Sequence, residues 1–333
     1  MKGATATRSE FLFCYDARMC NPNGDPDENR PRIDRVTSKS LVTEFRLKRT
    51  IRDYLQKQMG RPIFLRQELA DVQTGTIKTI NELAESEIST FLKEGSDIRE
   101  ALLKKYIDLR LFGLLFAVEG VEIKKKKVSL HFKQTGPVQF AIGQSLNKVE
   151  DISVRMTRVV PTREEAKAGT FGEKSIVRYA FIVFHGFLND HVAKEVGLSE
   201  EDVSDMMKGM WFGTTDLSTT SKYGQKSRLL IRVRYAKPNA YIGDLDQRIH
   251  LLPEEEDQED KELENISQFT LDISPLLNSL AKRKGDLQEI AWCFDSDLRC
   301  KLDETQGSLE QLVTDWSKKT GIAAPSLLNE WST

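Results

Sequence analysis

The strongest constraint on the fold is the order of three segments near the start of the chain: a strand, a loop and a basic helix. Residues 10–18 read EFLFCYDAR, in which aromatic residues alternate with others, and this pattern predicts a half-buried strand. The loop at 21–27 reads NPNGDPD, and all of these residue types favour turns. After Ser40, a favourable N-cap residue, no helix breaker occurs before Gly60. This order opens many α+β folds.

The predicted helix combines an apolar stripe with a concentration of positive charge. Residues 30–61 hold ten Lys and Arg against three Asp and Glu, although the whole chain has a formal net charge of −2. Helical spacing places an apolar set on one side: Leu47, Ile51, Tyr54 and Leu55. It places three cations and an aromatic ring on the other side: Phe45, Lys48, Arg49 and Arg52. This second set suits a nucleic-acid backbone and a stacked base, or forms a solvated face on which Arg49 pairs with Asp53.

Composition places the chain among soluble globular proteins. Of 333 residues, 39% are hydrophobic and 30% are charged, which is ordinary for a chain that buries a core. No apolar run approaches the roughly 20 residues of a membrane span. The first residues, MKGATATRSE, lack the apolar centre of a signal peptide. A cytoplasmic protein without a membrane partner is therefore expected.

Cysteine and histidine give little support for a metal or redox centre. The four cysteines fall in two pairs separated by five and six residues, and these gaps differ from those typical of zinc sites. We expect reduced thiols in the core. The four histidines form neither HxxxH nor HExxH, and the chain contains neither a P-loop nor GxGxxG. No metal, nucleotide or other cofactor is therefore expected.

The middle of the chain carries two predicted elaborations. Residues 60–112 read as a helical insertion, in which Asp97 and Glu100 form a capping box. Residues 153–160 and 176–188 read as two strands that bracket a projecting hairpin, placed at about 153–178. The side chains expected near the tip of this hairpin are Met156, Arg158, Val159, Val160 and Phe171. The apolar ones could wedge between bases, grip a neighbouring subunit or fold back onto the core.

Three further segments are unusual in composition. Residues 124–127 are four lysines, which suit a solvated turn, an edge guard against sheet pairing or a nucleic-acid contact. Residues 213–225, GTTDLSTTSKYGQ, could contact phosphates through backbone N–H groups. The acidic loop at 253–265 contains eight acidic residues and one lysine. Because no repeat or long linker interrupts the chain, residues 1–333 are expected to form a single elaborated domain.

Several of these segments together resemble one protein family. In chain order they are NPNGDPD, NRPRID, LVTEFRLKRTIRDYL, DLRLFG, TGPVQF, TRVVPTREEA and IVRYAFIVFHGF. They resemble the CRISPR-associated backbone subunit of type I (Cascade) effectors, with the subtype I-B form the most similar and the subtype I-C form related. The resemblance covers most of residues 8–245, and the acidic loop and the last third of the chain match less distinctly.

The resemblance implies an α+β fold with a modified RRM-like (ferredoxin-like) palm, helical fingers and an extended β-hairpin thumb. It also implies a non-catalytic RNA-binding protein of an antiviral ribonucleoprotein complex. Further copies of the chain would form a helical filament along the crRNA, and each thumb would displace one guide nucleotide. The nucleotides between would pair with target DNA. Other implied partners are the large subunit, the cap subunit and the crRNA-processing endonuclease of Cascade.

The resemblance implies roles for particular residues as well. The basic helix would contact guide phosphates through Thr43, Arg46, Lys48, Arg49 and Arg52, with Phe45 beside them. The preceding loop would lie near the guide or the next subunit through Asn21, Asn23, Arg30 and Arg32. The paired stacking aromatics of sequence-reading RRM domains are absent as a KGFGFVxF-like string. This departure favours backbone binding over base recognition.

Two other functions stay open on the sequence alone. Related backbone subunits of type III effectors cut RNA with a loop aspartate, and Asp25, Asp27 and Asp34 lie in the loop before the basic helix. Clustered carboxylates could hold Mg²⁺ and activate water, although Asp25 and Asp27 stand in strong turn signals. The weakly negative net charge instead fits a structural or interaction protein that binds no nucleic acid.

Overall fold

The computed structural model describes residues 4–25, 27, 30–71, 74–93, 97–123, 126–157, 171–255, 257–323 and 326–327. The chain divides into two compact units. The first comprises Met1–Ser9, Lys48–Gln139 and Phe187–Gly213, and the second comprises Glu10–Leu47, Phe140–Gly186 and Thr214–Thr333. The single elaborated domain expected from the sequence stays a prediction.

A nine-stranded sheet is the largest β-structure among the described residues. Its main path follows the order β17–β14–β11–β1–β10–β8–β2, and β7 and β9 also pair with β10. Its strands are β1 (Ser9–Cys20), β2 (Lys39–Val42), β7 (Val138–Phe140), β8 (Gly143–Lys148), β9 (Asp151–Thr157), β10 (Phe171–Leu188), β11 (Gln225–Tyr235), β14 (Leu287–Phe294) and β17 (Ser326–Leu327). Strand pairs β10–β8, β10–β9, β11–β14 and β2–β8 are antiparallel, whereas β14–β17 is parallel. The α+β class is confirmed, and its RRM-like character stays a prediction.

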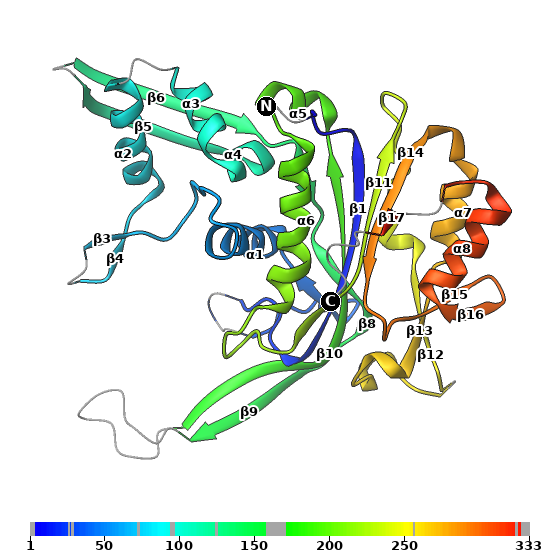
Figure 1. The fold of residues 1–333 in the computed structure, drawn as a ribbon. Coiled ribbons are helices and arrows are strands. Elements are labelled where there is room, and N and C mark those ends of the chain that lie inside the picture. The colour runs from blue at the N-terminus through cyan, green and yellow to red at the C-terminus, as the bar shows by residue number, and fades with distance from the viewer. Residues whose placement is uncertain are drawn as a thin grey trace. The chain divides into compact units, whose positions relative to one another are not determined.

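The second unit builds a core from β11, β14, a smaller sheet and two helices. The added elements are β12 (His250–Pro253), β13 (Phe269–Asp272), α7 (Ser274–Lys282), β15 (Arg299–Leu302), β16 (Thr305–Ser308) and α8 (Leu309–Thr320). Leu277 of α7, Trp292 of β14 and Trp316 of α8 belong to one buried cluster. Figure 1 shows α7 and α8 beside β14. The two helices therefore cover this part of the core.

Strand β1 differs from its prediction in one respect. It lies between β11 and β10, and every side chain from Ser9 to Ala17 is buried. The expectation of a half-buried strand is wrong, because both faces of this central strand are covered. Even Glu10 is buried, and its carboxylate accepts hydrogen bonds from the backbone N–H groups of Ile242 and Gly243, each at 2.9 Å. These donors satisfy a group that would otherwise destabilise the core.

The first unit is mostly helical. Its elements are α1 (Glu44–Lys57), whose first turn belongs to the second unit, β3 (Leu69–Asp71), β4 (Thr76–Ile77), α2 (Ile80–Lys93), α3 (Ile98–Lys105), α4 (Ile107–Phe112), β5 (Gly113–Ile123), β6 (Lys126–Thr135), α5 (Asp190–Val196) and α6 (Glu200–Thr215). The side chain of Asp97 accepts from the backbone N–H of Glu100 at 2.9 Å, which confirms Asp97 as the N-cap of α3 in the predicted capping box. The pair β3–β4 inside residues 60–112 was not expected. Of the four-lysine run, Lys124 and Lys125 lie outside the described residues.

Helices α1 and α6 approach closely within the first unit because α6 carries two glycines at the contact. A Cβ atom at Gly209 would lie 3.1 Å from Cγ2 of Ile51. A Cβ atom at Gly213 would lie 3.0 Å from Cβ of Tyr54. Side chains larger than hydrogen at these positions would push the helices apart. The packing of α1 against α6 therefore fixes which face of this part of α1 is buried.

Helix α1 begins later than the sequence suggests. Ser40, the expected N-cap, lies in β2, where its backbone N–H donates to Oγ of Ser145 at 2.9 Å. The residue before the helix is Thr43, whose Oγ1 accepts from the backbone N–H of Arg46 at 3.3 Å. The prediction of Ser40 as the cap is therefore wrong, because pairing of β2 with β8 keeps the backbone extended there.

The remaining sequence expectations concern cysteines, membranes and the acidic loop. All four cysteines are buried and free, which confirms the expected core thiols. In the part of the chain that the structure describes, no helix is long and apolar enough to cross a membrane. The acidic loop, except Glu256, is described, and Glu264 pairs with Arg178 at 3.0 Å.

Candidate nucleic-acid interface

Two predicted contact residues, Asn21 and Asn23, are buried in the loop before α1. Oδ1 of Asn23 accepts from the backbone N–H and the hydroxyl of Thr43, at 3.3 and 3.2 Å. The backbone N–H of Asn21 donates to the carbonyl of Ser221 at 2.9 Å. These bonds hold the loop against the start of α1 and against the 216–224 segment. The Asn23 side chain thus positions the start of α1, whereas Asn21 joins the 216–224 segment through its backbone, and the predicted contact of both with a guide stays a prediction.

Arg30 and Arg32 lie closer to solvent in the same loop. Arg30 pairs with Asp151 at 3.9 Å, and Arg32 pairs with Asp25 at 3.6 Å. Ion pairs this exposed contribute about 0–1 kcal/mol. A phosphate group can therefore compete for both guanidinium groups, in accordance with their predicted place near a polyanion.

The exposed face of α1 carries an aromatic ring and a guanidinium group one turn apart. Phe45 has 72% of its surface exposed. Arg49 is 41% exposed, and its Nε lies 3.0 and 2.9 Å from the two carboxylate oxygens of Asp53. The ion pair between Arg49 and Asp53 that was considered for a solvated face is thus present. The Phe45 ring remains exposed to solvent. An exposed ring beside a cation is a suitable surface for single-stranded nucleic acid.

Lys48 and Arg52, placed with Phe45 and Arg49 in the prediction, lie on the buried side instead. Lys48 is only 8% exposed, and its Nζ donates to Oε1 of Gln139 at 3.1 Å. Its ammonium and the Arg52 guanidinium lie over the ring of Phe112, at 5.6 and 5.1 Å from the centroid. The prediction that these two residues lie on the exposed face with Arg49 is therefore wrong. Tertiary packing buries a wider part of the helix surface than its apolar stripe.

The partner of Arg52 explains its burial. Asp108, from the DLRLFG segment, is completely buried and accepts from Nε of Arg52 at 3.1 Å. It also accepts from the backbone N–H groups of Phe64 and Leu65, at 2.9 and 3.1 Å. Burial lowers the pKa of Arg52, although the adjacent carboxylate opposes this. The pair is a structural ion pair inside the first unit, and removing either charge would leave the other buried without a counterion.

Two of the three loop carboxylates considered for catalysis, those of Asp25 and Asp34, accept hydrogen bonds from the backbone. Oδ1 of Asp25 accepts from the N–H of Asp27 at 3.0 Å. Oδ1 of Asp34 accepts from the N–H groups of Val36 and Thr37, at 2.8 and 3.4 Å, and these bonds lower the pKa of Asp34. This is the turn role that the alternative interpretation gave to Asp25 and Asp27. Among the described residues, no group of three or more His, Cys, Asp or Glu could hold a metal ion.

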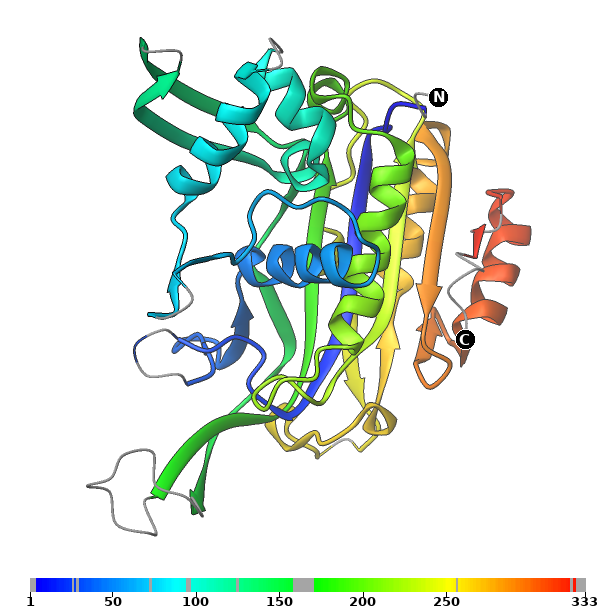
Figure 2. The same ribbon diagram turned by 60° about the vertical axis from the view of Figure 1, so that its left-hand side comes forward.

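The predicted thumb coincides with a two-stranded ladder. Strands β9 and β10 pair in register from Thr157 opposite Phe171 to Asp151 opposite Val177. Figure 2 shows this ladder extending past the other strands of the large sheet. Arg158, Val159 and Val160 lie outside the described residues. Met156 and Phe171 are placed in the strands, but their side chains lie outside what the structure describes, so all five thumb roles stay predictions.

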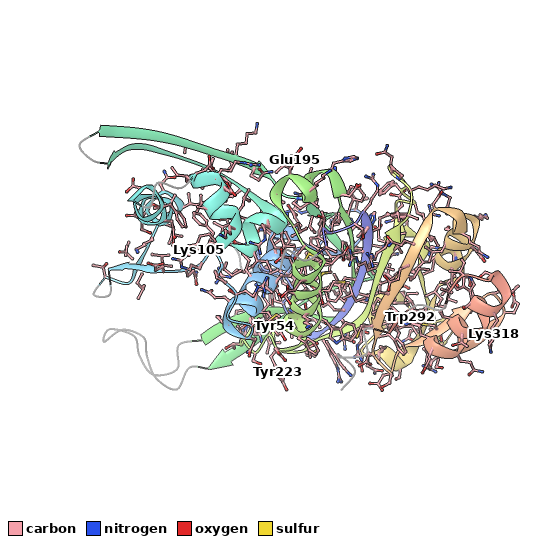
Figure 3. The ribbon with its side chains drawn as sticks, turned by 45° about the horizontal axis from the view of Figure 1, so that its top comes forward. Tyr54, Lys105, Glu195, Tyr223, Trp292 and Lys318 are labelled. Carbon is pink, nitrogen blue, oxygen red and sulfur yellow. The ribbon has the colours of Figure 1, made fainter. Side chains whose placement is uncertain are left out.

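The sequence analysis missed a side chain in the Gly/Ser/Thr-rich segment, where it considered only backbone N–H groups. Nζ of Lys222 donates to the carbonyl of Asn21 at 2.6 Å. The adjacent Tyr223 is 77% exposed and lies at the margin of the ribbon in Figure 3. The available signal was that Lys222 is the only cation in residues 213–225 and is followed by an aromatic ring.

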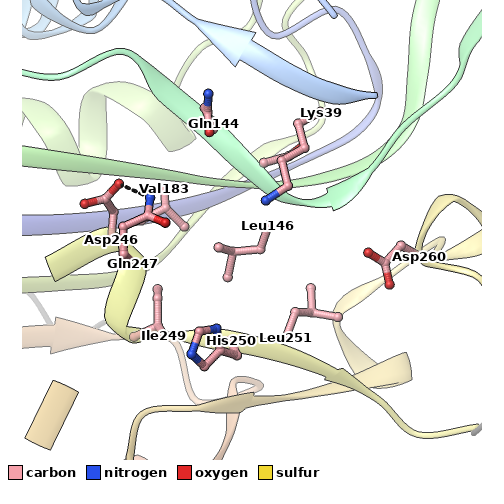
Figure 4. Close-up of a pocket in the computed structure, with 11 residues that line it drawn as sticks. Lys39, Gln144, Leu146, Val183, Asp246, Gln247, Ile249, His250, Leu251 and Asp260 are labelled. Carbon is pink, nitrogen blue, oxygen red and sulfur yellow. Dashed lines mark hydrogen bonds between the residues drawn. The ribbon is translucent and has the colours of Figure 1, made fainter. Parts of the chain in front are cut away.

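A separate cavity of about 200 Å³ lies in the second unit (Figure 4). Lys39 and His250 line it together with Asp246 and Asp260. With one lysine against two carboxylates, the charged side chains of the lining give the mouth no excess of positive charge. The cavity therefore lacks the positive potential that a polyanion requires.

Comparisons with known proteins identify the family. A family model described as "CRISPR-associated protein Cas7" matches residues 7–274. A protein of Haloferax volcanii with the same description is 31% identical over 314 residues, which cover 90% of this chain and 91% of that protein. In solved structures, a chain of a "CRISPR RNA-guided surveillance complex, pre-nicking" aligns with a TM-score of 0.51 at 10% identity, covering 89% of this chain and 96% of that chain. A second surveillance-complex chain gives 0.47 at 12% identity, with coverages of 85% and 88%. This chain therefore belongs to the CRISPR-associated Cas7 family.

Proposed function

We propose that this chain is a non-catalytic crRNA-binding backbone subunit of a type I-B Cascade complex. Copies of it assemble along the guide in the cytoplasm and present the guide for pairing with target DNA. Membership of the Cas7 family supports this function, as does the RNA-guided nature of the complex that contains a similarly folded chain. The observation that carries the proposal is the exposed pair on α1, Phe45 and Arg49.

The chemistry of this pair fits an RNA strand of any sequence. Every base offers a face to the Phe45 ring, and every nucleotide offers a phosphate to the Arg49 guanidinium. Neither contact reads a base edge, so guide pairing alone supplies specificity. Arg30, Arg32 and Arg46 add positive charge near this strand, whereas Lys48 and Arg52 support the helix from its buried side.

The other parts of the chain take the roles of the family architecture in this proposal. The large sheet forms an RRM-like palm, residues 60–112 form the fingers, and β9 and β10 form the base of the thumb. The thumb tip displaces a guide nucleotide at regular intervals. The large subunit, the cap subunit and the crRNA-processing endonuclease complete the assembly. The antiparallel ladder between β9 and β10 supports the thumb assignment.

The absence of catalysis in this proposal has its own support. A hydrolytic site needs carboxylates that are free to bind a metal ion or to activate water. Asp25 and Asp34 instead accept hydrogen bonds from nearby backbone N–H groups. Their geometry supports a loop-shaping role for both side chains.

The proposal is tested by the salt dependence of RNA binding in an Arg49→Gln variant. Each lost contact to a single-strand phosphate lowers the slope of log K against log salt by about 0.7. The matched control is Arg283→Gln, because Arg283 also pairs with a carboxylate near it in sequence, Asp286, at 2.6 Å. Fluorescence anisotropy with a labelled single-stranded RNA measures both variants and the unmodified chain.

We expect the slope to fall in Arg49→Gln and to stay unchanged in Arg283→Gln. Phe45→Ala should weaken binding at every salt concentration without changing the slope, because stacking involves no counterion release. A chain that binds no RNA even at low ionic strength, and that purifies without excess absorbance at 260 nm, would contradict the proposed function.

A further inference from the structure

The end of β1 and the 216–224 segment form a rigid corner in the second unit. The backbone N–H of Arg18 donates to the carbonyl of Gly224 at 2.9 Å, and that of Asn21 donates to the carbonyl of Ser221 at 2.9 Å. Gly224 has φ +109°, and a Cβ atom there would lie 2.3 Å from the carbonyl oxygen of Arg18. Only glycine fits this conformation and this approach. The corner therefore holds the side chains that follow in a fixed place.

Positive charge gathers at this corner. Nζ of Lys222 donates to the carbonyl of Asn21 at 2.6 Å, and Nζ of Lys174 donates to the carbonyl of Thr220 at 2.5 Å. Among the described residues, neither lysine forms an ion pair with a carboxylate. Burial, together with the nearby positive charge of Arg46, lowers the pKa of Lys222 to about 8. The Lys222 ammonium thus lies in surroundings that disfavour positive charge, and no carboxylate of the described residues forms an ion pair with it.

Two described groups near this corner could supply negative charge, the Cys20 thiol and the Asp16 carboxylate. Burial raises the pKa of the Cys20 thiol to about 12, so this group is uncharged at neutral pH although Lys222 and Lys174 favour its ionised form. Asp16 acts on Cys20 as well, but its carboxylate is held by Arg228 at 2.7 Å. A half-buried ammonium without a counterion is costly, and an external anion would relieve that cost.

We propose that Lys222, with Lys174 and Arg46 near it, forms a second phosphate-binding site for the guide strand, next to a stacking position on Tyr223. This inference rests on the proposed function, because it assigns the anion to the RNA backbone. The exposed ring of Tyr223 directly follows Lys222 and gives the site an aromatic face. A cation beside an aromatic ring matches a nucleotide of a single strand better than a free phosphate ion.

The test compares Lys222→Gln with Lys237→Gln in the same salt titration. Lys237 is 62% exposed and pairs with Asp286 at 2.7 Å, so its removal changes the net charge equally at a surface ion pair. We expect Lys222→Gln to lower the salt slope by about 0.7, and Lys237→Gln to leave it unchanged. Tyr223→Ala should weaken binding roughly tenfold at constant slope, because one stacked base contributes free energy of that order. Thermal unfolding checks that the variants remain folded, and Lys222→Arg should keep the slope of the unmodified chain.

The outcomes separate this inference from the function on which it rests. If the unmodified chain binds RNA and Lys222→Gln keeps its slope, the Lys222 site is refuted while the proposed function stands. The same conclusion follows if Lys222→Gln impairs only self-assembly, since the anion would then be a protein carboxylate. If the unmodified chain binds no RNA, the proposed function fails, and this site fails with it.

Discussion

Arg52 and Lys222 are two cations removed in part from solvent, each in a different unit, and they differ in the group that each one faces. Arg52 faces a completely buried carboxylate, Asp108, at 3.1 Å. Lys222 faces a backbone carbonyl, that of Asn21, and forms no ion pair with any described residue. One cation is neutralised inside the protein, and the other is not. The first holds the fold together, whereas the second is available to an anion from outside.

This difference gives a criterion for separating structural from binding cations in a basic region. Charge density alone assigns Lys48, Arg49 and Arg52 to one surface. Burial and partners divide them, because Lys48 and Arg52 have partners in the interior and Arg49 pairs only at an exposed surface. A surface pair exchanges its partner at little cost, whereas a buried pair does not.

The largest expected effect is the loss of stability when the buried pair loses one charge. Asp108→Asn leaves the Arg52 guanidinium without its counterion and weakens the acceptor for Phe64 and Leu65. The free energy of unfolding should fall by about 3–5 kcal/mol, as is typical when one partner of a buried ion pair is removed. Urea-induced unfolding measures it.

The control for this prediction is Asp53→Asn, which removes the exposed partner of Arg49. Exposed pairs contribute about 0–1 kcal/mol, so this variant should remain close to the unmodified chain. If both variants lost the same small amount, the pair of Arg52 and Asp108 would not be structural. The proposed difference between Arg52, which has a buried counterion, and Lys222, which has none among the described residues, would then have no basis.

A smaller effect is expected in the pH dependence of stability. The pKa of Lys222 is lowered in the folded chain to about 8, from an ordinary value of 10.5. Between these pH values the unfolded chain keeps a proton that the folded chain has released. The contribution of Lys222 to stability should therefore increase as the pH rises through this window. The difference in unfolding free energy between the unmodified chain and Lys222→Gln, measured from pH 7 to pH 11, isolates it.

The same measurement in the presence of bound RNA tests whether a phosphate lies beside Lys222. A phosphate beside Lys222 favours its charged form and raises its pKa toward the ordinary value. The increase in stability with pH should then shrink when single-stranded RNA is present. An increase that is identical with and without RNA would mean that no phosphate approaches Lys222.

Local chemistry made most elements predictable from the sequence. The helix cap at Asp97 involves residues three apart, and the Asp97 side chain accepts from the backbone N–H of Glu100 in the structure. The strand at β10 and the helices α7 and α8 follow from short apolar patterns. These signals depend on neighbours along the chain, so a sequence displays them directly.

The parts that could not be predicted depend on partners far away in the chain. Arg52 is buried because Asp108 lies 56 residues further along, and helical periodicity contains no information on that contact. Ser40 satisfies the composition of an N-cap, but pairing with β8 places it in a strand. Lys222 was missed for the same reason, since its surroundings are formed by the end of β1, some two hundred residues earlier.

The smallest expected effect concerns the carboxylates of the loop before α1. They extend the comparison of Arg52 and Lys222 from cations to anions. Asp34 is exposed, but two backbone N–H groups already donate to one oxygen of its carboxylate, Oδ1. A guide-loaded assembly incubated with labelled complementary RNA and Mg²⁺ should therefore leave the RNA intact, and Asp34→Asn or Asp25→Asn should change nothing on a denaturing gel. Regularly spaced cuts that disappear in either variant would show that a carboxylate with backbone partners still binds a metal ion. Hydrogen-bond partners would then not separate structural from binding carboxylates, because a metal ion can replace an N–H donor at a carboxylate that stays charged. The same criterion for lysine and arginine side chains would be unaffected.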